Sequence, residues 1–85
     1  MFKNKNDSSN NLCGKNVKKY RLEQLPRLSQ RGLADKLQLE GIDLDKNAIQ
    51  RIESGQRFVT DIELLALSKV LNVSLADLLN TSNNF

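Results

Sequence analysis

The chain has 85 residues, with 13 Lys or Arg and 10 Asp or Glu, so its formal net charge is +3. A chain of this length is expected to form one domain with a modest core and no separate catalytic or effector-binding domain. Because the sequence contains no His and a single Cys, Cys13, an intrachain disulfide is excluded and a structural zinc site is not expected.

Both ends of the chain are polar. Residues 1–12 are rich in Asn, Ser and Lys and show no apolar period, so we expect a disordered N-terminal tail. Residues 81–85 are expected to form a second, short polar tail. Between the tails the apolar residues recur at helical spacing, and no segment shows a period of two. The sequence therefore predicts one all-α domain over residues 13–80.

Two helices are expected in the first half of this domain. The first covers about residues 15–24 and is ended by Pro26, because proline disfavours the helical conformation in the preceding residue. Ser29 caps the second helix, which is expected to stop near Gln38. The expected inward positions are Val17, Tyr20 and Leu25 in the first helix, and Leu33, Ala34 and Leu37 in the second.

A loop of residues 39–44 leads to a third expected helix, about residues 45–54. Asp45 is a suitable N-cap, because its carboxylate accepts a hydrogen bond from a free backbone N–H. Ile49 and Ile52 form the buried face, and Gly55 supplies a left-handed C-cap.

The last two expected helices both begin at a capping residue. Thr60 and Glu63 form a capping box at the start of the longest helix, about residues 60–71, which Asn72 ends. Ser74 opens a short fifth helix. The apolar positions are Ile62, Leu65, Ala66 and Val70, expected to face inward in the longest helix, and Leu75, Leu78 and Leu79 in the last.

Three stretches of the sequence together resemble a known family. They are SQRGLADKL at residues 29–37, KNAIQRIESGQRF at residues 46–58, and LNVSLADLL at residues 71–79. The pattern is similar to the helix-turn-helix family of phage repressor and Cro-type regulators, also called the xenobiotic-response-element family, and it covers about residues 14–80. The resemblance implies a compact five-helix bundle of the lambda-repressor-like type. About five extra residues between the second and third helices depart from the short turn of that family.

The resemblance implies that the third helix lies in the major groove of DNA. Opposite its buried face, the helix carries Lys46, Asn47, Gln50 and Arg51. Lys or Arg can donate to guanine, and Asn or Gln can pair with adenine, so these four residues are the expected base contacts. Two alternatives stay open: the side chains are ordinary solvated polar groups, or Arg51 contacts phosphate instead of a base.

Further residues are candidates for phosphate contacts. The resemblance implies this role for Gln30, which opens the second helix and also braces the recognition helix in the family, and for Gln56 and Arg57 after the third helix. Basic side chains add candidates because a phosphate contact needs only a suitably placed cation or donor. These are Arg31, Lys18, Lys15 and Lys19.

Arg21 and Glu53 match an arginine of the first helix and a glutamate of the third that pair in the resembled family. We interpret this pair as structural, because it would hold the recognition helix against the first helix.

The charge distribution is consistent with a polyanionic partner. Residues 1–31 hold eight basic and two acidic side chains, whereas residues 58–85 hold one basic and three acidic. Many soluble domains are equally basic, so charge alone does not select nucleic acid. No apolar run approaches the roughly 20 residues of a membrane helix, and the N-terminus lacks the apolar stretch of a secretion signal, so we expect a cytoplasmic protein that does not bind a membrane.

The sequence shows no catalytic set: it has no His for acid–base chemistry and no Gly-rich phosphate loop, so we expect no enzyme and no cofactor. The expected function is a prokaryotic transcriptional regulator that binds specific sequences in double-stranded DNA. One alternative is a module that binds a protein partner, such as an antitoxin that binds a toxin, or a target of an anti-repressor. Another is the controller of a restriction–modification operon, which also binds DNA. A homodimer stays open, with Phe58, Leu79 and Phe85 as candidates for its surface.

Overall fold

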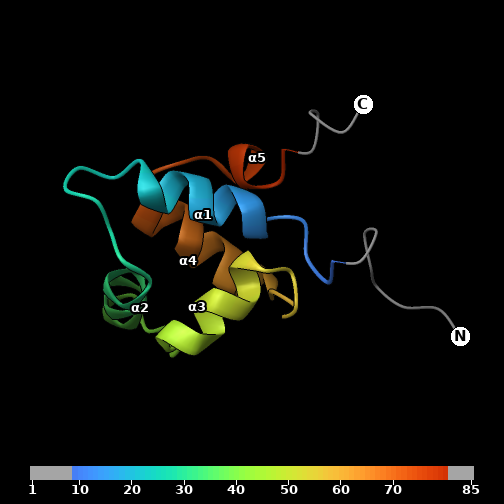
Figure 1. Cartoon of the computed structure of the whole chain (residues 1–85), viewed down its shortest axis with the longest axis horizontal. Helices are drawn as coiled ribbons and strands as arrows, with labels where there is room; N and C mark the ends of the chain where they lie inside the picture. The colour runs from blue at the N-terminus through green and yellow to red at the C-terminus, as the bar shows by residue number, and fades with distance from the viewer. Residues whose placement is uncertain (1–8, 81–85) are drawn as a thin grey trace, which may run out of the picture.

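The computed structural model describes residues 9–80 of the chain, and these residues form five helices and no β-strand. The helices are α1 (Gly14–Leu22), α2 (Gln30–Leu39), α3 (Lys46–Glu53), α4 (Asp61–Leu71) and α5 (Leu75–Leu78) (Figure 1). The all-α class and the five-helix architecture expected from the sequence are confirmed. Residues 81–85, and residues 1–8 of the expected N-terminal tail, lie outside the described residues.

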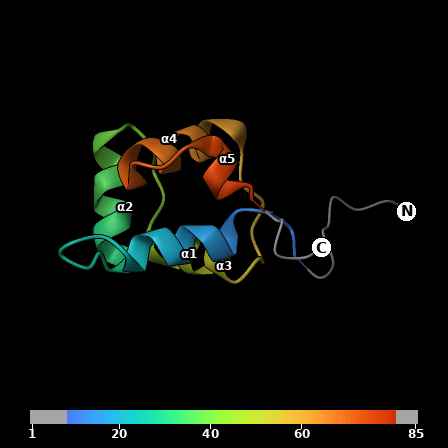
Figure 2. The same ribbon diagram turned by 90° about the horizontal axis from the view of Figure 1, so that it is seen from above.

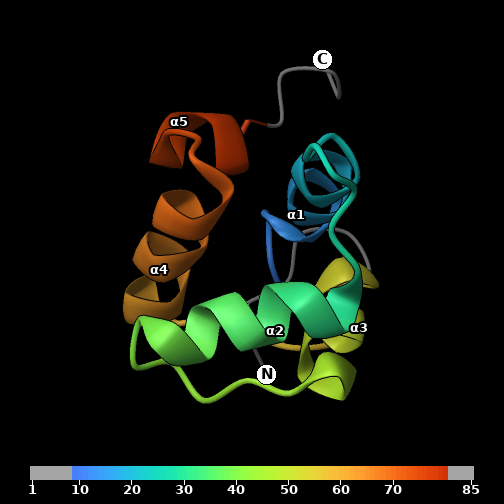
Figure 3. The ribbon, with the colours of Figure 1, turned by 90° about the vertical axis from the view of Figure 1, so that its left-hand side faces the viewer.

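The helices surround one interior. Figure 2 shows α4 and α5 along one side and α1 along the other, with α2 closing one end. In Figure 3, α2 crosses below α1 and α4, and α5 lies at the opposite end of the molecule. α3 packs mainly on α1 and α2, whereas α5 packs on α1 and α4. This arrangement leaves one face of α3 directed to solvent.

A single core joins all five helices. Every helix contributes at least one buried apolar residue, and the segments before α1 and before α3 contribute Cys13 and Leu44. Removing these side chains from water is the main term that stabilises a domain of this size. The apolar core residues are Cys13, Val17, Leu33, Ala34, Leu37, Leu44, Ala48, Ile49, Ile52, Ala66, Leu67, Leu71 and Leu78.

The expected N-caps are confirmed. Ser29 Oγ accepts a hydrogen bond from the backbone N–H of Gly32 at 2.9 Å, and Asp45 Oδ1 accepts one from Ala48 at 2.8 Å. Reciprocal capping boxes begin α4, at Thr60, and α5, at Ser74. Each cap satisfies backbone donors that a helix otherwise leaves unpaired, so the local sequence determines where these four helices begin.

Gly55 ends α3 as expected, with a φ of +84° in the left-handed region. The N–H of Gly55 donates to the carbonyl of Ile52 at 3.0 Å, and the N–H of Gln56 donates to the carbonyl of Arg51 at 2.8 Å. This pair of bonds is the Schellman motif, which requires a residue that tolerates positive φ. The turn after α3 therefore has a defined path.

The prediction for the end of the first helix is wrong in two respects. α1 ends at Leu22, with Glu23 as its C-cap, so it stops two residues earlier than expected and four residues before Pro26. Leu25 was expected to face inward but is 97% exposed. Since Leu25 lies beyond the helix, its helical spacing from Val17 no longer places it on the buried face.

Two inward positions expected in α4 are also wrong. Ile62 and Leu65 are 68% and 47% exposed, whereas Leu67 and Leu71 are fully or almost fully buried. Apolar residues surround almost the whole of this helix, so the spacing alone does not identify the buried face. Contacts with α1, α2 and α5 determine it instead.

The extended connection between α2 and α3 is anchored in the core. Leu39, which was expected to open the loop, is the last residue of α2. Residues 40–45 then run to α3, with Leu44 buried and Ile42 partly buried against the core. The additional residues therefore follow a path fixed by apolar contacts, and Asp45 still lies at the N-cap position of α3.

Candidate nucleic-acid interface

α3 presents two chemically different faces. Ala48, Ile49 and Ile52 are buried against the core, and both isoleucines are completely inaccessible. The side chains expected to contact bases, Lys46, Asn47, Gln50 and Arg51, are all exposed. The eight-residue helix thus keeps its amide and cationic side chains free in solvent while its opposite face is fixed in the core.

A network of polar side chains holds α3 against α1 and α2. Arg21 Nε and Nη2 donate to the two carboxylate oxygens of Glu53 at 2.7 and 3.0 Å. Gln30 Nε2 donates to the same carboxylate at 3.0 Å. The side chains of Arg21 and Glu53 are only 9% and 4% exposed. The structure therefore brings together one residue from each of the first three helices at the C-terminal end of α3.

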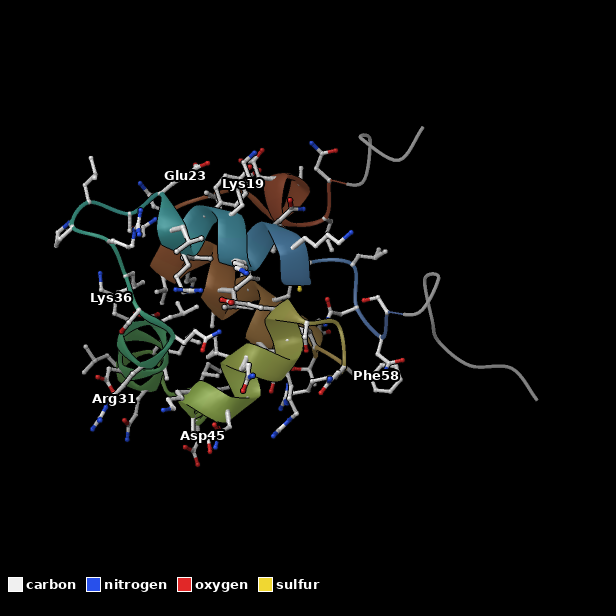
Figure 4. All side chains as sticks on the ribbon, in the orientation of Figure 1. Lys19, Glu23, Arg31, Lys36, Asp45 and Phe58 are labelled. Carbon is white, nitrogen blue, oxygen red and sulfur yellow. The ribbon has the colours of Figure 1, made fainter. Side chains whose placement is uncertain are left out.

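Gln30 and Arg31 lie at the N-terminus of α2. One amide hydrogen of Gln30 is used by Glu53, and its second hydrogen, together with the first-turn N–H groups of α2, can donate to an anion. Arg31 is exposed and lies on the same side of the molecule as Asp45, the N-cap of α3 (Figure 4). A hollow between α2 and α3 is lined by Arg31, Lys46 and Asn47 together with the carboxylates of Asp35 and Asp43.

α1 carries three of the candidate lysines, Lys15, Lys18 and Lys19, and all three are exposed. Lys18 is exposed, and Lys19 is exposed on the side of α1 opposite Asp45 and α3 (Figure 4). The ammonium of Lys19 lies 5.1 Å from the centre of the Tyr20 ring, a cation–π distance. Among the candidates for phosphate contacts, Lys19 thus lies on the side of α1 that faces away from α3.

Arg57 is paired with a carboxylate that the sequence analysis did not assign to it. Its Nη1 and Nη2 donate to the two oxygens of Glu63 at 2.9 and 3.1 Å, and Nη1 also donates to the carbonyl of Phe58 at 2.9 Å. The hydrogen bonds from Arg57, with smaller contributions from Thr60, lower the pKa of Glu63 although partial burial raises it. Because the charge of Arg57 is largely compensated, this residue is the least available of the expected phosphate contacts. Gln56, in contrast, is exposed.

The segment before α1 contacts the turn after α3. Asn10 and Asn11, placed in the expected N-terminal tail, donate to backbone carbonyls of residues 52–57. Residues 9–12 therefore belong with the folded domain. Their composition indicated a tail, and no local pattern in the sequence signals a contact with residues more than 40 positions away.

Cys13 is a core residue at the start of α1 and is 2% exposed. Burial raises the pKa of its thiol to about 11, because the thiolate would lose its hydration. A neutral, inaccessible thiol is typical of a structural cysteine.

The residues considered for a dimer surface are separated. Leu79 follows α5 and is 40% exposed, whereas Phe58 is 54% exposed on the turn after α3, well apart from α5 in Figure 4. Phe85 lies outside the described residues.

Comparison with known proteins agrees with this geometry. A family model described as helix-turn-helix matches residues 17–78, which include most of α1 and all of α2 to α5. Comparisons with curated proteins and with solved structures gave no match. Within residues 9–80, no helix is long and apolar enough to cross a membrane. Since the match covers well over half of the chain, the protein belongs to the helix-turn-helix family of DNA-binding domains.

Proposed function

We propose that this protein is a transcriptional regulator that recognises a specific sequence in double-stranded DNA by inserting α3 into the major groove. The observation that carries the proposal is the division of α3 into a fully buried face, formed by Ile49 and Ile52, and an exposed face of amide and cationic side chains. A recognition helix needs this division, because base readout requires side chains that reach base edges from a fixed backbone.

We assign base contacts to the exposed residues in α3. Asn47 and Gln50 suit adenine, since a carboxamide pairs with both N6 and N7 of that base. Lys46 and Arg51 suit guanine, and Arg51 can alternatively contact a phosphate. The carboxylate of Glu53 faces Arg21 and Gln30, so it is already occupied and is not part of the readout.

We assign phosphate contacts to donors around this helix. Gln30 and Arg31 stand at the start of α2, the helix that precedes α3 in the chain, and Gln56 stands in the turn that follows α3. Lys18 is an exposed candidate on α1. These contacts would orient the domain on the duplex and carry little sequence information. Arg57 would contribute only by exchanging Glu63 for a phosphate.

We also propose that the protein binds DNA as a homodimer through α5. Leu75 is the first residue of α5 and Leu79 is its C-cap, four positions later, and they are 41% and 40% exposed. A dimer would read two half-sites about one helical turn, roughly 34–36 Å, apart. Analytical ultracentrifugation of Leu79→Glu, with Leu39→Glu at an exposed position of α2 as the matched control, tests this surface. The wild type and the control should sediment as dimers and Leu79→Glu as a monomer, and a monomeric wild type would refute the dimer without affecting the DNA proposal.

The experiment that tests the main proposal is selection from a randomised duplex library at two salt concentrations. The expected result is an enriched motif that survives the higher salt, while non-specific binding decreases steeply with salt. Binding without enrichment would contradict sequence-specific regulation. No binding at moderate salt would favour the alternative in which this fold binds a protein partner such as a toxin.

A further inference from the structure

Residues 9–11 form a clasp on the turn that follows the recognition helix. The backbone N–H of Asn10 donates to the carbonyl of Gly55 at 2.7 Å, and its side-chain amide donates to the carbonyl of Gln56 at 2.9 Å. These partners are 45 to 46 residues away in the sequence. We call residues 9–11 the N-terminal clasp.

Asn11 connects three segments with one side chain. Its Nδ2 donates to the carbonyl of Ile52 at 3.1 Å, in the last turn of α3, and to the carbonyl of Arg57 at 2.7 Å. Its Oδ1 accepts a hydrogen bond from the N–H of Gly14 at 2.7 Å, at the start of α1. Three of the four hydrogen bonds that a carboxamide readily makes are thus formed, and the residue is partly buried. Asn11 therefore ties the beginning of α1 to both ends of the turn.

Two glycines permit this close approach. A Cβ atom at Gly55 would lie 2.6 Å from Ser9 Oγ, and a Cβ atom at Gly14 would overlap the carbonyl oxygen of Ile52. Side chains at either position would push the clasp, α1 or the turn apart. The contact consequently depends on the backbones themselves as well as on the two asparagine side chains.

The turn held by the clasp carries Gln56, the phosphate contact assigned after α3. The clasp lies outside the part of the chain that the helix-turn-helix family model matches, since residues 9–11 precede residues 17–78. With the carbonyls of residues 52, 55, 56 and 57 all bonded to the clasp, the orientation of the peptide units in the turn is restrained. Restraint in the binding conformation lowers the ordering cost that association would otherwise incur.

We propose that the N-terminal clasp presets the turn after α3 for contact with the DNA backbone, with Asn11 as the positioning residue and Gln56 as the residue it positions. This inference rests on the proposed function for the role of Gln56, whereas the hold of the clasp on the turn does not depend on DNA.

Asn11→Asp is the variant that removes the hydrogen bonds from Asn11 to the turn with the least change in side-chain shape. The aspartate has nearly the same shape, keeps an oxygen to accept from Gly14, and places a negative charge where the N-terminus of α1 favours it. It lacks the two donors, so its carboxylate faces the carbonyl oxygens of Ile52 and Arg57. Ser74→Ala, which removes the cap of α5, is the control for general loss of stability.

The first readout is amide hydrogen exchange of the free protein. The N–H groups of Gln56 and Arg57 both donate to the carbonyl of Arg51, at 2.8 and 3.2 Å, so their exchange reports on the turn. In Asn11→Asp these two amides should exchange at least about tenfold faster, while the amide of Leu33 in α2 should change no more than in Ser74→Ala. Equal effects of the two variants on the turn amides would overturn the proposal.

The second readout is a double-mutant cycle on DNA binding. Gln56→Ala should weaken binding about three- to tenfold, the range for one neutral hydrogen bond, and equally for specific and non-specific duplexes. Asn11→Asp should cause a similar loss, and the double variant should lose no more than the weaker-binding single variant. Losses that multiply would overturn the assignment of Asn11 as the residue that positions Gln56. If the wild type binds no duplex DNA, the proposed function is wrong, and the exchange readout alone decides whether the clasp holds the turn.

Discussion

Arg21 of α1 donates two parallel hydrogen bonds to the carboxylate of Glu53 in α3, from Nε at 2.7 Å and from Nη2 at 3.0 Å. Its Nη1 donates to the carbonyl of Leu28 at 2.9 Å. A bidentate pair of this kind fixes distance and angle together. It therefore links the position of α3 to α1 and to the segment that leads into α2.

Replacing Arg21 by Ala should destabilise the fold by about 3–5 kcal/mol, because the nearly buried carboxylate of Glu53 would lose its charged partner. Urea unfolding measures this loss, and DNA binding should disappear along with folding. A variant that keeps the full melting temperature and still loses DNA binding would show that Arg21 acts directly on DNA.

Asn47→Ala and Gln50→Ala should each relax the base preference at one position of the site. A bidentate pair contributes about 1–3 kcal/mol of discrimination, so the ratio of affinities for the preferred and substituted base pair should decrease by about five- to 150-fold. Competition binding with single-base-pair substitutions measures the ratio. If both variants lose affinity equally for every duplex, these residues contact the backbone or are simply solvated.

Arg31→Gln should lower the dependence of DNA affinity on salt. Each phosphate neutralised by a cation adds about 0.9 to the slope of log K against log salt concentration, so the slope should decrease by about that amount. Lys19→Gln is the matched control, since Lys19 lies on the side of α1 opposite α3. An equal change in both variants would mean that only the net charge matters.

Gly55→Ala should destabilise the protein more than Gly41→Ala. Both glycines have positive φ, +84° and +83°, and an L-residue in this region costs about 1–2 kcal/mol. A Cβ at Gly41 meets nothing within 4 Å, whereas a Cβ at Gly55 meets Ser9 Oγ. The difference between the two urea midpoints therefore isolates the contact with the clasp, and equal midpoints would indicate that Ser9 moves aside freely.

Acid should remove the stabilisation that comes from Glu63. Hydrogen bonds from Arg57 hold its pKa below the ordinary value of 4.5 in the folded protein. A carboxyl group with a lowered folded pKa contributes stability above the unfolded value and loses it as the pH falls through the folded value. The difference in urea midpoint between wild type and Glu63→Gln should thus shrink as the pH falls from 7 to 3. A difference that does not change with pH would mean that Glu63 acts only through the shape of the capping box.

Much of the fold was predictable because it depends on neighbours in the chain. The caps at Ser29, Asp45 and Thr60 are hydrogen bonds across three residues, and the positive φ at Gly55 suits glycine because it has no Cβ. The buried face of α3 was also predictable, since Ile49 and Ile52 are three residues apart, the spacing of one helix face, with polar residues between them. The motif that joins these local signals suffices to indicate the family.

Other features of the fold depend on the tertiary structure and were not predictable from the sequence. The period of α4 does not distinguish Ile62 from Leu67, because both lie in an apolar run and only packing on α1, α2 and α5 selects the buried side. Asn11 bonds the turn after α3 from 46 residues away. Arg57 pairs with Glu63 only six residues along the chain, but the pairing depends on the path of the turn between α3 and α4 and not on helical spacing. The sequence by itself thus determined the helices and the composition of the exposed face of α3. The tertiary structure decided which polar groups are hydrogen-bonded and which remain available, because these side-chain hydrogen bonds follow from packing and not from local spacing.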